Sequence, residues 1–204
     1  MVKIMDETSK ITVQKALDLS EQGEYREAIE LLYEVVDRYP NFSTGFELIG
    51  DFYLRNAQPD LAIRPLEMAL EINQDSYASH FLLGCAYGRT LHFEEAIEEL
   101  EIALEFKPED GEVMRNIGWI TCMGGNLNRG RDFLLKALEL EPDNGLIYND
   151  LAASYMFSNS RDLEKARYWL EKARTIEPDE PFIQLTYQSF LEMQQTMASV
   201  DSAF

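Results

Sequence analysis

The stretch LLGCAYGRTLHFEEAIEELEIALEFKP, residues 82–108, contains two helical patterns separated by a short break. In its second half, Ile97, Leu100 and Leu104 recur at the three- and four-residue spacing that places side chains on one face of a helix. The stretch LIGDFYLRNAQPDLAIRPLEMALEIN, residues 48–73, has the same two-part organisation. Because the breaks are short, we expect the two helices of each part to pack as antiparallel neighbours.

Both stretches belong to a repeat with a period of 34 residues. One column of this repeat holds small residues, at Gly50, Gly84, Gly118 and Ala152. Other columns are formed by Ala28, Ala62, Ala96 and Gly130, by Leu32, Leu66, Leu100 and Leu134, and by Ala69, Ala103 and Ala137. Gly and Ala let two helix backbones approach closely, and Leu fills the adjoining space. No single helix pair can bury its apolar face alone, so the pairs are expected to stack on one another.

The period predicts five repeats, at residues 9–42, 43–76, 77–110, 111–144 and 145–180. An apolar helix without a second half is expected at residues 181–197, where it would cap the last repeat. Residues 1–8 and 198–204 are expected to be flexible ends. Pro65 falls inside the second helix expected for the second repeat, and we expect that helix to bend or to start late.

The small-residue columns, the tyrosines at 53, 87 and 155 and the prolines at 40, 108 and 142 that close repeats resemble the tetratricopeptide repeat family. The resemblance covers about residues 9–180. It implies an all-α fold, a right-handed superhelical solenoid in which the first helix of each repeat lines a concave face. It also implies protein binding, but the family hosts many unrelated binding roles, so the partner stays open.

Composition narrows the kind of partner. The 204 residues include 18 Lys and Arg against 37 Asp and Glu, a formal net charge of −19. Because 46% of the residues are hydrophobic, the chain has enough apolar side chains to form a buried core, and we expect it to fold rather than to be an acidic disordered tail. So negative a surface disfavours nucleic acid and anionic membranes, and favours a protein segment with apolar or basic residues. No apolar run has the length of a membrane span or a secretion signal, so we expect a soluble, cytoplasmic protein.

Candidate catalytic or metal-binding residues are few. Cys85 and Cys122 are far apart and are expected to be reduced thiols, and His80 and His92 are the only histidines. They do not make a convergent set of metal ligands, and no nucleophile or phosphate-binding motif occurs. The glutamates between residues 94 and 105 are expected on a solvated helix face. We therefore expect no enzyme activity, no metal and no cofactor.

The first helices supply the candidate binding residues. The 34-residue registration predicts a concave groove that contains Glu47, Asp51, Leu54, Phe81, Cys85, Arg115, Trp119, Cys122, Asn149 and Met156. We interpret it as an apolar groove beside two acidic residues, suited to a segment with apolar and basic residues. The alternative is that Phe81 and Trp119 only pack against neighbouring helices. Some family members hold acidic C-termini of chaperones in a carboxylate clamp, but the matching positions here lack its Lys and Arg residues.

These patterns predict an interaction scaffold or adaptor that binds a peptide or helix of a partner protein in the concave groove. The alternative is a self-assembling structural protein that forms homo-oligomers through its tail or its convex face.

Overall fold

The computed structural model describes residues 5–157 and 162–201, and these residues form eleven α-helices and no β-strand. The helices pair as hairpins: α1 (Glu7–Glu21) with α2 (Tyr25–Arg38), α3 (Ser43–Arg55) with α4 (Pro59–Ile72), α5 (Tyr77–Arg89) with α6 (Phe93–Phe106), α7 (Gly111–Met123) with α8 (Leu127–Leu140), and α9 (Gly145–Met156) with α10 (Leu163–Ile176). The last helix, α11 (Pro181–Asp201), has no second half. The expected all-α hairpin repeat is confirmed.

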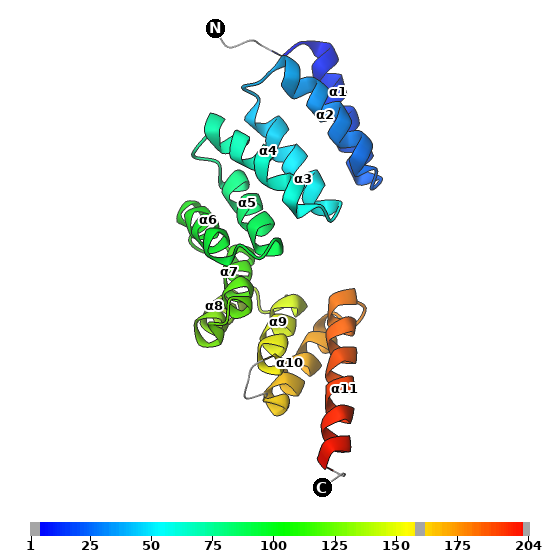
Figure 1. Cartoon of the computed structure of the whole chain (residues 1–204), viewed down its shortest axis with the longest axis vertical. Coiled ribbons are helices and arrows are strands. Elements are labelled where there is room, and N and C mark those ends of the chain that lie inside the picture. The colour runs from blue at the N-terminus through cyan, green and yellow to red at the C-terminus, as the bar shows by residue number, and fades with distance from the viewer. Residues whose placement is uncertain (1–4, 158–161, 202–204) are drawn as a thin grey trace. The chain divides into compact units, whose positions relative to one another are not determined.

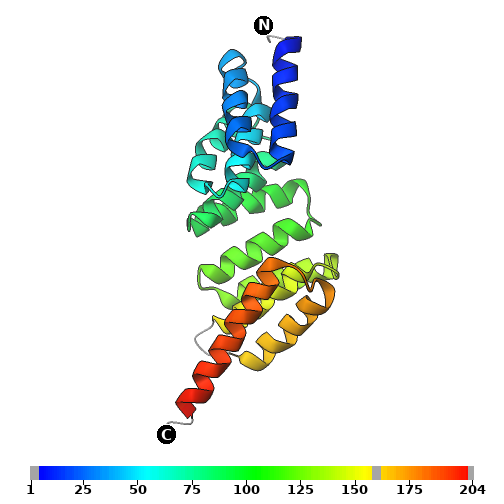
Figure 2. The ribbon, with the colours of Figure 1, turned by 90° about the vertical axis from the view of Figure 1, so that its right-hand side faces the viewer.

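The chain divides into two compact units, an N-terminal unit of Met1–Lys107 and a C-terminal unit of Pro108–Phe204 (Figure 1). In the N-terminal unit, α2 packs on α3, and α5 packs on both α3 and α4. In the C-terminal unit, α9 packs on α7 and α8, and α11 packs on α9 and α10 (Figure 2). Each hairpin therefore buries its apolar face against the next hairpin of the same unit.

The small-residue column acts as predicted from its spacing. A Cβ atom at Gly84 would lie 2.6 Å from Cγ of Leu100, and one at Gly118 would lie 2.8 Å from Cγ of Leu134. Both leucines are fully buried. A larger side chain in this column would separate the two helices of a hairpin, so glycine allows their close approach.

The turns inside the hairpins share a backbone conformation that also repeats every 34 residues. Gly23, Ala57, Leu91 and Gly125 have φ values of 80°, 56°, 66° and 93°. This left-handed conformation is easy for glycine and costs other residues roughly 1 kcal/mol. The turn geometry is therefore kept even where its preferred residue is missing.

Polar side chains begin the first helices. The Ser76 Oγ accepts a hydrogen bond from the Ser79 backbone N–H at 3.2 Å, and the Asp110 Oδ1 accepts one from the Val113 N–H at 3.1 Å. Such N-caps satisfy backbone donors that lack a partner within the helix. Such caps mark the start of four of the five described hairpins, whereas α3 begins after Phe42 and has no side-chain cap.

Two expectations about single helices have different outcomes. α4 begins at Pro59 and continues through Pro65, so the expectation of a late start is wrong, whereas the bend stays a prediction. α11 covers the last hairpin with Phe190, which is buried beside Met156 and Leu170, and it extends to Asp201. Of the flexible ends expected at residues 1–8 and 198–204, residues 7–8 belong to α1 and residues 198–201 to α11, whereas residues 1–4 and 202–204 lie outside the described residues.

Candidate binding surfaces

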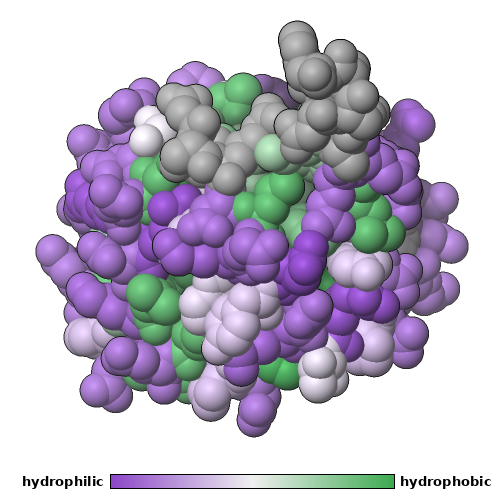
Figure 3. Space-filling view, turned by 90° about the horizontal axis from the view of Figure 1, so that it is seen from below, coloured by the Kyte–Doolittle hydropathy of each residue, from purple (hydrophilic) through white to green (hydrophobic). Residues whose placement is uncertain are grey.

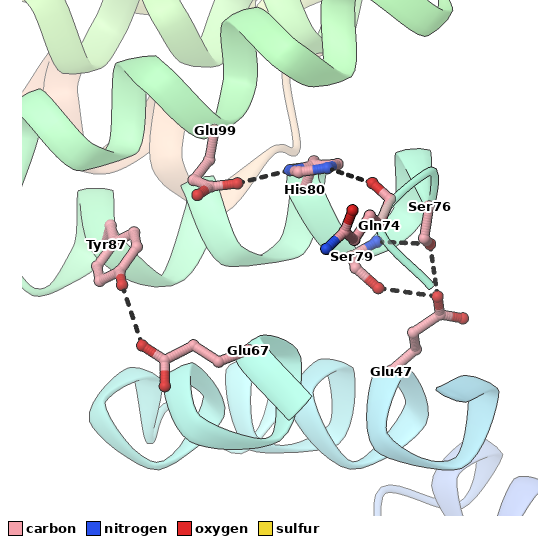
Figure 4. A network of polar contacts seen from close by, with 8 residues as sticks. All are labelled: Glu47, Glu67, Gln74, Ser76, Ser79, His80, Tyr87 and Glu99. Atoms are coloured by element: carbon pink, nitrogen blue, oxygen red, sulfur yellow. Dashed lines mark hydrogen bonds and ion pairs between the residues drawn. The ribbon is translucent and has the colours of Figure 1, made fainter. Parts of the chain in front are cut away.

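Two of the acidic residues expected to attract a basic partner are engaged inside the N-terminal unit. Glu47 on α3 accepts hydrogen bonds from the hydroxyls of Ser76, at 2.5 Å, and of Ser79, at 2.8 Å (Figure 4). Asp51 is held by Arg55, whose Nε lies 2.8 Å from its carboxylate. Glu47 therefore links α3 to the start of α5, and both carboxylates already have hydrogen-bond partners within their own unit.

The same view shows that His80 has a structural role. Its Nδ1 lies 2.6 Å from a carboxylate oxygen of Glu99, and its Nε2 lies 3.0 Å from the Gln74 carbonyl oxygen (Figure 4). The ring is buried and stacks on Phe106. Both ring nitrogens are occupied by groups of this unit, so His80 ties α5 to α6 and to the preceding turn.

Phe81 and Cys85 are the two candidate residues of α5, and both are half-buried. Phe81 stacks on Tyr77, with ring centroids 6.0 Å apart and planes almost parallel, and Lys107 covers the Tyr77 ring at 3.7 Å. This part of the first helix is thus packed but still reaches solvent. Leu54 on α3 is only 5% exposed and belongs to a core cluster with Leu83.

In the C-terminal unit, Arg115 and Asp150 form a partly buried ion pair that joins α7 to α9. The Arg115 Nε donates to a carboxylate oxygen of Asp150 at 2.7 Å. Burial raises the pKa of Asp150, and the nearby Arg115 charge opposes part of that increase. The carboxylate is therefore costly to hold in its charged form and depends on its partner.

The remaining candidates of this unit differ in how accessible they are. Trp119 on α7 is half-buried, so part of its ring reaches solvent. Cys122, Asn149 and Met156 are buried, Met156 completely. Burial raises the pKa of the Cys122 thiol to about 11. The Asn149 Oδ1 has no hydrogen-bond partner within the described residues.

Four of the ten expected groove residues therefore pack inside their own unit, and we leave them out of the proposed surface. They are Leu54, Cys122, Asn149 and Met156. The 34-residue registration predicts which face of its helix a residue occupies. It does not predict how closely neighbouring helices approach: Leu54 packs in a cluster with Leu83 of α5, and Met156 packs in one with Leu170 of α10 and Phe190 of α11.

Sequence reasoning missed an apolar pair on α11, formed by Phe182 and Leu185. Their side chains are 67% and 65% exposed, and the residues lie one helical turn apart. Because the fifth repeat is two residues longer than the others, they lie 36 residues after Leu146 and Asn149 on α9. Registration with that longer spacing would have placed them beside the first-helix residues. We call Arg115, Trp119, Leu146, Phe182 and Leu185 the first-helix face of the C-terminal unit.

Comparison with protein-family models finds two matches, both to the tetratricopeptide repeat, at residues 13–77 and 77–110. The chain is therefore a tetratricopeptide repeat protein. Solved structures of the same fold agree. The structure of TTC0263, a thermophilic TPR protein from Thermus thermophilus, covers 90% of this chain and 98% of its own length, with a TM-score of 0.73 and 18% identity. A crystal structure of the MamA protein covers 85% of this chain and 94% of its own length, with a TM-score of 0.71 and 20% identity.

The curated relatives are much longer proteins. Tetratricopeptide repeat protein 21B of Mus musculus is 28% identical over 172 residues, which are 84% of this chain but 13% of the relative. The TPR repeat-containing thioredoxin TDX of Arabidopsis thaliana is 29% identical over 105 residues, half of this chain and 28% of the relative. These matches support the repeat and its role as an interaction scaffold. They cover only a small part of each relative, so the relatives' other functions are not transferred to this chain.

Within residues 5–157 and 162–201, no group of three or more His, Cys, Asp or Glu side chains is arranged to hold a metal ion. Across the same residues, no helix combines the length and the apolar character needed to cross a membrane. The expectations of no enzyme activity, no cofactor and a cytoplasmic location stay predictions.

Proposed function

We propose that this repeat protein is an adaptor that binds an apolar segment of a partner protein on the first-helix face of the C-terminal unit. The observation that carries the proposal is the exposure of Phe182 and Leu185 side by side on α11. The half-buried Trp119 and Leu146 belong to the same face, on the two first helices that precede α11.

Phe182 and Leu185 are two of several large apolar side chains that are exposed in the described residues. On the face shown in Figure 3, hydrophilic residues predominate and apolar ones gather in separate patches. A partner would therefore be held by a few apolar anchors rather than by one large apolar area. Burying two large side chains contributes roughly 1.5–3 kcal/mol each, before the cost of ordering the segment. These two side chains alone do not reach a micromolar affinity, about −8 kcal/mol, so we expect contacts with Trp119 and Leu146 to contribute as well.

Charge near this face favours apolar recognition over a salt bridge. Arg115, the charged residue of this face, already binds Asp150 of the same unit. One solved structure of similar fold, YrrB, is described as a TPR protein with an unusual peptide-binding site; it is 20% identical, with a TM-score of 0.66. That likeness supports peptide binding as a use of the fold, and does not identify the ligand.

A peptide selection tests the proposal. Random peptides displayed on phage are selected on the full chain, and the affinity of the recovered peptides is measured by calorimetry with Phe182→Ala, Leu185→Ala and Trp119→Ala variants. Each substitution is expected to weaken binding by 2 kcal/mol or more, about thirtyfold, as for an interface anchor. Circular dichroism should be unchanged.

Leu61→Ala is the matched control, because Leu61 is 52% exposed on α4 of the other unit. It should leave the affinity unaltered. If selected peptides bind all four variants equally, the first-helix face is not the binding surface. If they respond to Phe81→Ala instead, the site is on α5 of the N-terminal unit.

A further inference from the structure

Positive charge is concentrated on the second helices of the C-terminal unit. α8 and α10 hold seven of the chain's 18 Lys and Arg residues and only four acidic residues, a net charge of +3 in a chain of −19. The second helices of the N-terminal unit, α2, α4 and α6, hold three Arg and thirteen acidic residues. A basic surface is therefore a local feature of two helices and not a property of the repeat.

Each of these seven cations lies over an aromatic ring. Two are close: the Arg131 guanidinium is 3.8 Å from the centroid of Tyr155, and that of Arg174 is 3.9 Å from Tyr187. The other five, at 5.2 to 5.9 Å from a ring centroid, are Arg129, Lys136, Lys165, Arg167 and Lys172. The rings restrict flexible side chains, which lowers the entropy lost when a ligand binds them.

Cations from α8 and α10 converge at one ring. Lys165 of α10 lies 5.3 Å from the same Tyr155 ring that Arg131 of α8 covers. Two turns further along α10, Lys172 lies 5.2 Å from Tyr168, which is 53% exposed. We call Arg131, Tyr155, Lys165, Tyr168 and Lys172 the basic aromatic surface.

The polar groups of this surface are only partly used within the unit. Arg131 donates from Nε and Nη2 to Ser154, and Lys165 pairs with Asp162 at 3.0 Å while its side chain stays 60% exposed. A pair so exposed contributes little and can be exchanged. Lys172 has no ion pair within the part of the chain that the structure describes. Lys165 and Lys172 are seven residues apart on a helix, so they recur about 10 Å apart.

We propose that the basic aromatic surface binds an acidic segment of another protein, with carboxylates on Lys165 and Lys172 and apolar contact on Tyr168. Charge complementarity carries the choice of ligand. A long polyanion would also meet the rest of the C-terminal unit, where 16 acidic residues outnumber nine basic ones, so a short acidic segment fits better than nucleic acid. This surface involves no residue of the first-helix face, so the inference does not depend on the proposed function.

The test uses a fluorescein-labelled deca-glutamate peptide and the full chain, with binding followed by anisotropy at low and at physiological salt. The wild type is expected to bind, with an affinity that falls as salt rises. Lys165→Glu with Lys172→Glu should weaken binding about tenfold or more. Lys165→Met with Lys172→Met, which removes charge and keeps apolar bulk, should weaken it less.

Arg167→Glu with Arg174→Glu is the matched control, because these residues lie on the flank of the same helix that faces Phe190 and Tyr187 of α11. It should change the affinity less than threefold, and circular dichroism should show both variants folded. The inference is overturned if the peptide does not bind, or if both double variants lose binding equally. It is also overturned if single-stranded dT10 binds more tightly than the peptide, or if the same lysines instead control self-association in sedimentation.

Discussion

Replacement of Arg115 by Met should destabilise the C-terminal unit far more than the partial exposure of the Arg115 side chain suggests. The change removes the partner of Asp150, whose side chain is only 8% exposed, and leaves a carboxylate buried without a counter-charge. Breaking such a pair costs about 3–5 kcal/mol. Because the Arg115 side chain is 23% exposed, water can reach part of the site, and we expect the lower end, ~3 kcal/mol.

Urea unfolding measures this loss directly. Both tryptophans, Trp119 and Trp169, lie in the C-terminal unit, so their fluorescence reports on the unit that contains the ion pair. The matched control is Arg55→Met, which breaks the Asp51–Arg55 pair at a similar distance but with the Arg55 side chain 57% exposed. Followed by circular dichroism, the control should lose no more than about 1 kcal/mol.

The pH dependence gives a second check on the same variant. A carboxyl group whose pKa is raised on folding contributes stability at low pH, and that contribution is lost as the pH rises through its folded-state value. Without Arg115 the pKa of Asp150 rises further, so the loss in Arg115→Met should be full at neutral pH and shrink on acidification. A loss below 1 kcal/mol at neutral pH, or one independent of pH, would refute the buried-pair reasoning.

Three further changes test the packing. Leu91→Gly should stabilise the N-terminal unit by ~0.5 kcal/mol in thermal unfolding, because the residue has φ 66° and its side chain is 66% exposed; a loss would mean that the exposed side chain matters more than the backbone. Gly130→Ala should cost ~2 kcal/mol in urea, because its Cβ would lie 2.6 Å from the Gly118 carbonyl oxygen; a gain would show that the backbones separate easily. The Cys122 thiol, with a pKa of about 11, should react with iodoacetamide at pH 8 roughly a hundredfold more slowly than an ordinary thiol, and unfolding should abolish the difference.

The sequence was sufficient to predict the architecture because the same packing residues recur at equivalent positions of the repeats. Gly84 and Gly118 meet Leu100 and Leu134 in equivalent ways, so one column predicts every hairpin contact of its kind. Gly130 shows the limit of this reasoning. It stands in a column otherwise made of Ala, and the column alone would suggest that Ala fits there. The structure brings the backbones of α7 and α8 too close for that substitution.

The candidate surfaces were harder to predict because exposure depends on neighbours outside the repeat. Met156 has the register of a groove residue, yet α11 covers it by packing Phe190 in the same cluster. Phe182 and Leu185 are exposed for the opposite reason, since the described chain has no further hairpin to pack on α11. Their position could have been found by registering α11 with the 36-residue spacing of the fifth repeat. The charge difference between α6 and α10 could also have been predicted from the sequence, by counting charges for each helix separately. The net charge of −19 describes the whole chain and does not show this difference.

Stability and recognition use different positions of the same repeat in the C-terminal unit. The columns of Gly118, Leu134 and Ala137 hold the hairpins together and are fully enclosed, so a ligand cannot reach them. The first-helix face and the basic aromatic surface share no residue, although α9 carries Leu146 of the first and Tyr155 of the second, and each surface has its own chemistry. A substitution at Leu185 can therefore change apolar binding, and one at Lys172 can change acidic binding, without a cost to folding. If either change alters the binding measured for the other surface, the two are coupled through the unit, and the separation argued from the repeat positions is wrong.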